Sequence, residues 1–138
     1  MSHHTRGRKA EPKPIADAVR KAPQPPKDWP AAAKREWRRI MPILVERGVL
    51  SPADMHAVER FCEAAADIAS AREAIAQHGA YIADRHGELK RNPAYATLRE
   101  ATAESRRWSA EIGLTPASRS RVTAEPEVAD DDDSPLAV

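Results

Sequence analysis

The feature that most constrains the fold is a run of helically spaced apolar residues between Ser51 and Gly79. Apolar side chains recur at steps of three, three and one, with Arg72 as the single break in the stripe, and this spacing is that of one face of an α-helix. Ser51-Pro52 at one end and Gly79 at the other are typical helix start and stop signals. Roughly 27 helical residues would extend about 40 Å, so the sequence predicts one long central helix.

A shorter helix is predicted before the central one. Asp28 is a suitable N-cap, and Pro30 falls inside the first turn. The apolar stripe that follows ends before Gly48, which suits a helix C-terminus. Pro42 lies within the stripe, and we expect it to kink or interrupt the helix because it has no backbone N–H to donate.

After Gly79 the helical period is lost, which favours a short β-hairpin or an ordered loop over residues 80–91. Asn92 and Pro93 then open a third helix that ends at Gly113, and a last turn is expected over residues 117–121. The predicted fold class is therefore all-α. It consists of a helical hairpin with a long central helix, a third helix and a possible short β-hairpin.

The net charge of +1 hides a strong polarity along the chain. Residues 1–39 hold eleven basic and four acidic residues, residues 40–122 hold eleven of each, and residues 123–138 hold six acidic residues and no basic one. Six of the 12 prolines lie in the first 30 residues, where few large apolar side chains offset the entropy cost of ordering the chain. We expect a disordered basic Pro-rich arm over residues 1–27, a helical core for oligomerisation and DNA binding over 28–122, and a disordered acidic tail over 123–138.

The basic arm and the first helix favour contact with nucleic acid. Lysine and arginine at this density neutralise phosphates and release counterions, which needs no fixed structure. The candidate DNA-binding residues are Arg6, Arg8, Lys9, Lys13, Arg20, Lys21, Lys27, Lys34, Arg35, Arg38 and Arg39. The last four are expected on the helix face opposite Trp37 and Ile40. A charged surface that serves solubility, or that docks onto an acidic protein, stays open as an alternative.

The helical core is small, which points to self-association. Two or three helices in about 90 residues bury limited apolar surface in one chain, and a long helix with an Ala-rich face commonly packs against another copy. We therefore expect a homo-oligomer. The candidate core and subunit-contact residues are Trp37, Leu44, Met55, Val58, Phe61, Cys62, Ala65, Ile68, Ile75, Leu98 and Trp108.

The sequence lacks the motifs of several function classes. No phosphate-binding glycine loop, dinucleotide-binding glycine motif or zinc-protease motif occurs, so we expect no enzyme, no cofactor and no metal site. Cys62 is the single cysteine, which excludes an internal disulfide and favours a reducing, cytoplasmic setting. No apolar run approaches the ~20 residues that span a bilayer.

With these segments laid out, the sequence resembles the small terminase subunits of tailed phages. The resemblance rests on Pro26-Lys27-Asp28-Trp29, Gly48-Val49-Leu50-Ser51, Phe61-Cys62, Lys90-Arg91-Asn92-Pro93 and the stretch from Gly113 to Val122. The last two are the most specific, and the similarity covers roughly residues 12–122. One departure is Ala64-Ala65-Ala66, where the family often has an aromatic residue after the cysteine.

The resemblance implies a non-catalytic packaging factor encoded by a phage or prophage. Such subunits assemble as rings, recognise viral DNA where packaging starts, and recruit and regulate the large terminase subunit, which carries the ATPase and nuclease. The implied partners are double-stranded viral DNA, the large terminase subunit and further copies of the chain, in the cytoplasm of the bacterial host. A helix-turn-helix transcriptional regulator and a structural interaction protein that does not bind DNA remain alternatives. A ring would support the terminase subunit, and a dimer would support the regulator.

Overall fold

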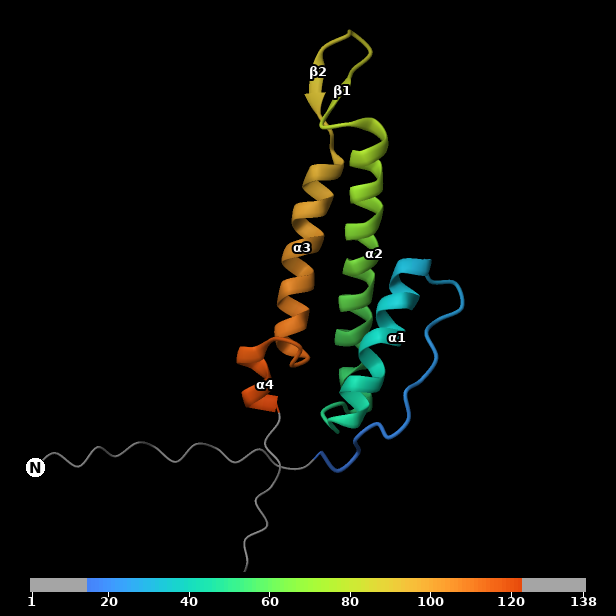
Figure 1. Cartoon of the computed structure of the whole chain (residues 1–138), viewed down its shortest axis with the longest axis vertical. Helices are drawn as coiled ribbons and strands as arrows, with labels where there is room; N and C mark the ends of the chain where they lie inside the picture. The colour runs from blue at the N-terminus through green and yellow to red at the C-terminus, as the bar shows by residue number, and fades with distance from the viewer. Residues whose placement is uncertain (1–14, 123–138) are drawn as a thin grey trace, which may run out of the picture.

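The fold is a set of helices arranged around one long helix, with a small β-hairpin at one end (Figure 1). The computed structural model describes residues 15–122. In chain order the elements are α1 (Ala31–Glu46), a 3-10 turn (Pro52–Asp54), α2 (Met55–His78), β1 (Tyr81–Ala83), β2 (Leu89–Arg91), α3 (Ala94–Glu111) and α4 (Pro116–Val122). The predicted fold class, helical with a short hairpin, is confirmed.

The long helix α2 begins and ends where the sequence predicts. The Asp54 carboxylate accepts hydrogen bonds from the Ser51 backbone N–H at 2.8 Å and from the Ser51 hydroxyl at 2.9 Å, so the Asp54 side chain satisfies the Ser51 N–H at the helix start as in a capping box. The first turn is 3-10, so α2 itself starts at Met55. Gly79 closes the helix with φ of 82°, a backbone conformation that favours glycine.

Helix α1 differs from the sequence prediction at two places. Its N-cap is Pro30 rather than Asp28, because Pro30 has extended backbone and its carbonyl accepts the first helical hydrogen bond, from the Lys34 N–H at 3.1 Å. The helix also runs uninterrupted through Pro42. Pro42 lies on the exposed side of α1, where water can satisfy the Arg38 carbonyl that lacks its usual donor.

The β-hairpin connects α2 to α3 and is closed at its base by Asn92. β1 and β2 pair antiparallel, with Tyr81 opposite Arg91. The Asn92 side chain donates to the Gly79 carbonyl at 2.9 Å and accepts from the Ala94 N–H at 3.0 Å. One buried side chain therefore joins the end of α2 to the start of α3, which aligns the two helices side by side (Figure 1).

The hydrophobic core sits where α1 packs against the first half of α2. Ile40, Leu44, Val58 and Cys62 are fully buried there, and Ile112 from the end of α3 completes the cluster. Figure 1 shows that α1 lies alongside only the first half of α2. Among the described helices, the second half of α2 packs against α3 alone. This end of the molecule therefore consists of two helices and the β-hairpin.

The predicted core and subunit-contact residues divide between these two ends. The structure buries Trp37, Leu44, Val58, Phe61 and Cys62, and leaves Met55, Ala65, Ile68, Ile75, Leu98 and Trp108 half-buried. Met55 and Trp108 border the core. Ile68, Ile75 and Leu98 belong to the thinner end.

Residues 15–30 form an extended segment, here called the strap, that runs along α1 (Figure 1). The Val19 N–H donates to the Leu50 carbonyl at 2.7 Å, and the Trp37 indole N–H donates to the Pro23 carbonyl at 2.8 Å. The Trp29 ring meets the Trp37 ring edge-on at 5.6 Å. The composition of residues 1–27 predicts disorder, and the structure instead places residues 15–27 against α1.

Candidate nucleic-acid interface

The outer face of α1 carries three exposed arginines, two of which have no partner among residues 15–122. Arg35 and Arg38 are three residues apart, so they share one face of the helix, away from the buried Trp37 and Ile40. Within residues 15–122 neither side chain makes a hydrogen bond or an ion pair. Both guanidinium groups therefore keep their full hydrogen-bonding capacity for a ligand.

Two other cations of α1 are already engaged. Arg39 forms a bidentate ion pair with Glu36 on the same helix, and that hydrogen bond raises the pKa of Arg39 above its usual value. The Lys34 ammonium donates to the Lys27 carbonyl of the strap at 2.5 Å. The four basic residues of α1 predicted as one cluster thus separate into two open and two occupied cations.

The strap brings three further cations beside α1. The exposed basic residues of the strap are Arg20, Lys21 and Lys27, and their side chains have no ion-pair partner in the described part of the chain. The strap also carries two exposed acids, Asp17 and Asp28. The remaining candidates, Arg6, Arg8, Lys9 and Lys13, lie outside the described residues.

The ordering of the strap depends on contacts that the sequence analysis missed. Trp29 and Trp37 lie eight residues apart, and Pro23 lies a further six residues before Trp29, so no single helical or strand period connects them. The signal for this contact in the sequence was Trp37 itself, a predicted core residue, because a buried Trp N–H usually finds an acceptor. This hydrogen bond fixes the basic strap to the basic helix.

Cys62 and the His, Asp and Glu side chains are the remaining chemical groups of interest in the described residues. Burial raises the pKa of the Cys62 thiol to about 12, so the sulfur is protonated and enclosed. Within residues 15–122 no group of three His, Cys, Asp or Glu is placed to hold a metal ion. None of the described helices is long and apolar enough to cross a membrane.

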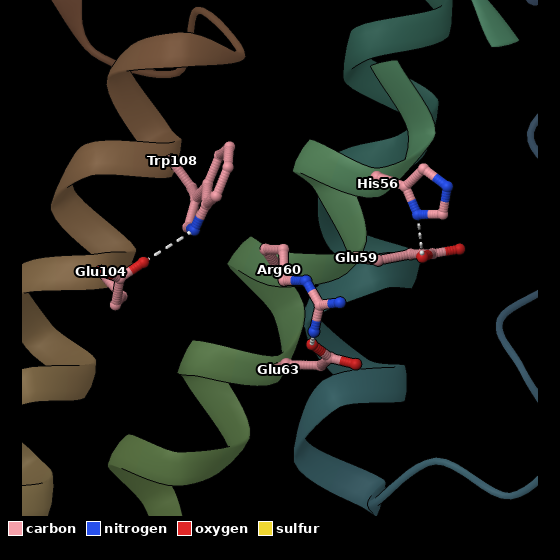
Figure 2. A network of polar contacts seen from close by, with 6 residues as sticks. All are labelled: His56, Glu59, Arg60, Glu63, Glu104 and Trp108. Carbon is pink, nitrogen blue, oxygen red and sulfur yellow. Dashed lines mark hydrogen bonds and ion pairs between the residues drawn. The ribbon is translucent and has the colours of Figure 1, made fainter. Parts of the chain in front are cut away.

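A second charged surface lies between α2 and α3. Glu63 pairs with Arg60 at 2.7 Å, and the Trp108 indole N–H donates to Glu104 at 3.0 Å (Figure 2). Figure 2 shows Trp108 pointing from α3 toward α2. A groove of about 300 Å³ runs here, lined by these four residues and by Ala64, Asp67, Thr97, Glu100 and Ala101. The surface is predominantly acidic and faces solvent.

Comparison with known proteins identifies a family to which the chain is similar. A family model described as phage terminase, small subunit, matches residues 33–128. The matched region starts in the first turn of α1 and includes α2, the hairpin, α3 and α4, and it leaves the strap outside. No curated protein and no solved structure matches the chain.

Proposed function

The chain belongs to the phage terminase small-subunit family, and we propose that within phage DNA packaging it is the non-catalytic subunit that binds viral DNA where packaging starts. In this proposal it self-assembles, and it recruits and regulates the large terminase subunit, which supplies the ATPase and nuclease. Family membership favours this function over the helix-turn-helix regulator and over an interaction protein that does not bind DNA.

The observation that supports DNA binding most directly is the set of open cations on α1 and the strap. These are Arg20, Lys21, Lys27, Arg35 and Arg38. Trp37 holds the strap in place through the Pro23 carbonyl, so the cations are positioned before any ligand arrives. Because these cations have no ion-pair partner among residues 15–122, they lose no ion pair with that part of the chain when they contact phosphate. Arginine can also bind phosphate through two parallel hydrogen bonds.

The first test compares open with occupied arginines. Arg35→Gln together with Arg38→Gln should reduce the slope of log K against log[salt] for duplex DNA by about 1.8, because each phosphate contact contributes about 0.9. Arg39→Gln is the matched control on the same helix, and its slope should change less because Glu36 already neutralises that charge. Fluorescence anisotropy between ~50 and ~200 mM salt measures both slopes.

The second test removes the part of the arm before the strap. Deleting residues 1–14 eliminates Arg6, Arg8, Lys9 and Lys13 and keeps every strap contact described above. We expect weaker DNA binding and a further reduction of the salt slope, with unchanged circular dichroism. If the full chain assembles but binds no duplex DNA at ~50 mM salt, the DNA-binding function is refuted, and the structural interaction protein replaces it.

A further inference from the structure

The two sides of α3 carry opposite charge. One side presents Tyr95, Leu98, Arg99 and Thr102, which with Arg91 line an open apolar groove of about 520 Å³. The other side presents Thr97, Glu100, Ala101 and Glu104, which line the acidic groove against α2. With 3.6 residues per turn, the centres of these two sets are about 160° apart around the helix. The basic and apolar side of α3 therefore lies nearly opposite its acidic side.

The basic side continues into the hairpin as an apolar strip. Side chains alternate across a strand, so Tyr81, Leu89 and Arg91 share one face of the two-stranded ladder. Tyr81 is 58% exposed and Leu89 is 73% exposed. The Arg91 guanidinium stacks 4.2 Å from the centre of the Tyr95 ring. We call the surface formed by Tyr81, Leu89, Arg91, Tyr95, Leu98 and Arg99 the strip.

The charges nearest the middle of each side have no partner in the described part of the molecule. On the acidic side, Arg60 and Arg107 pair with Glu63 and Glu104, but Asp67 and Glu100 are exposed and make no hydrogen bond or ion pair with residues 15–122. On the other side, Arg99 is exposed and equally unpaired within that range.

The floor of the acidic groove leaves room for an incoming side chain. Ala64 and Ala101 form that floor and are 5% and 6% exposed. Small residues at this level create a recess between the rims that carry Asp67 and Glu100. The recess is therefore suited to a long cationic side chain whose stem packs on alanine and whose guanidinium reaches the carboxylates.

From this arrangement we propose that the strip of one copy packs into the acidic groove of the next, with Arg99 between Asp67 and Glu100 of its neighbour. This inference rests on the self-assembly in the proposed function and specifies its interface. Arg99 and Glu100 are consecutive, so they lie within about 1.5 Å of the same height along α3. A rotation about an axis parallel to α3 preserves height and brings the two sides together. Such a head-to-tail contact generates a ring where the rotation closes.

The same geometry favours a second copy over an unrelated partner. Two complementary surfaces at matching height on one element allow every copy to use both, so no partner of different composition is needed. Charge complementarity would also set the register, because sliding one copy along the other would separate Arg99 from both carboxylates. The exposed Tyr81 and Leu89 would be covered by the neighbour at the hairpin end.

The test exchanges the charges. Arg99→Glu alone should place like charges together and shift the molecular mass toward that of the monomer in native mass spectrometry or light scattering at ~150 mM salt. Glu100→Arg combined with Asp67→Asn should do the same from the other side. An equimolar mixture of the two variants should re-form assemblies larger than either variant gives alone, because each interface between unlike subunits then joins opposite charges. Strict alternation requires an even number of subunits in a closed ring.

The controls separate charge from folding. Glu46→Arg, an exposed charge reversal on α1, should leave the mass unchanged. Because all substituted side chains are exposed, far-UV circular dichroism should match the wild type, and recovery in the mixture requires that both variants are folded. If each variant alone keeps the wild-type mass, or if the mixture stays at the mass of the separate variants, this interface is refuted while the proposed DNA-packaging function stands. A wild-type chain that is monomeric at every concentration tested would refute the self-assembly as well.

Discussion

Trp37 is the residue on which most of the N-terminal architecture depends. Its indole lies in the core at 3% exposed, donates to the Pro23 carbonyl at 2.8 Å and packs in a T-shaped arrangement with the Trp29 ring. One side chain therefore joins the core to the strap, and the strap carries three of the open cations.

Replacing Trp37 should release the strap while leaving the helices folded. Trp37→Phe keeps an aromatic ring in the core but removes the N–H, so we expect a loss of roughly 1–3 kcal/mol in the free energy of unfolding, from the hydrogen bond and the smaller ring together. Limited trypsin digestion should cleave faster after Arg20 and Lys21. Trp108→Phe is the matched control, because the Trp108 indole N–H donates to Glu104 and not to the strap. Equal cleavage rates in the two variants would contradict this role.

The buried environment of Cys62 makes its thiol unsuited to act as a nucleophile or a metal ligand. The thiol is fully buried between α1 and α2, and desolvation raises its pKa to about 12. A thiol that stays protonated is a weak nucleophile and a poor metal ligand. The residue acts as a small apolar side chain at the centre of the core.

At the scale of elements, the β-hairpin depends on the acceptor atoms of Asp84. One Asp84 oxygen accepts the N–H groups of His86 and Glu88 at 2.8 and 3.1 Å, and the other pairs with Lys90 at 2.7 Å. These interactions, the Lys90 hydrogen bond first among them, hold the pKa of Asp84 below its usual value. The turn and the ladder are therefore both attached to one carboxylate.

Acid should loosen this hairpin before it unfolds the helices. A carboxylate with a lowered pKa stabilises the fold above its unfolded pKa of about 3.9, and this contribution is lost as the pH falls through the lower folded value. Asp84→Ala should produce the same loosening at neutral pH, whereas Asp84→Asn, which keeps an oxygen acceptor, should produce less. Amide hydrogen exchange at His86 and Glu88 reports the change. Identical exchange in Asp84→Ala and wild type would show that the carboxylate does not hold the turn.

The sequence predicts best those elements whose signals are local. Ser51, Asp54 and Gly79 lie within a few residues of the helix ends that they define, so the bounds of α2 followed from spacing and capping rules. The strap could not be predicted in this way, because the Trp37 to Pro23 hydrogen bond joins residues 14 apart across irregular chain. Asp28 was wrong as a cap because the restricted backbone of Pro30, two residues later, sets the start of α1 at Ala31.

In the candidate site, too, the features with local sequence signals could be predicted and those that need the folded chain could not. The charge pattern identified the basic residues of the strap and α1, but it could not distinguish open from occupied cations. The Arg39 pair with Glu36 follows from a spacing of three residues and could have been predicted. The Lys34 contact with the Lys27 carbonyl requires the folded strap. The opposite charges on the two sides of α3 could be seen in the sequence, because Arg99 and Glu100 are consecutive and so point to different sides of a helix. The acidic groove could not be predicted, because Asp67 of α2 lines it together with Glu100.

At the scale of the whole molecule, the two ends of the α2–α3 pair differ in how much of their surface is buried. The end beside α1 contains the fully buried Ile40, Leu44 and Val58. The hairpin end retains the half-buried Ile68, Ile75 and Leu98 and two exposed strands. An isolated pair of helices has little apolar surface to offset the entropy of ordering. The hairpin end is therefore where the proposed contact with a second copy would stabilise the chain most.

This difference predicts how the molecule responds when assembly is blocked. In the Arg99→Glu variant, amide hydrogen exchange should accelerate over residues 68–100, whereas residues 33–62 should keep their wild-type protection, because the core against α1 is complete within one chain. The melting temperature of the wild type should rise with protein concentration, since assembly stabilises the folded state by mass action, and that of the variant should not. Uniform acceleration of exchange along the whole chain would mean that the variant is globally destabilised rather than unassembled. Unchanged exchange over residues 68–100, in a variant shown to be monomeric, would mean that the two-helix end is stable without a neighbour.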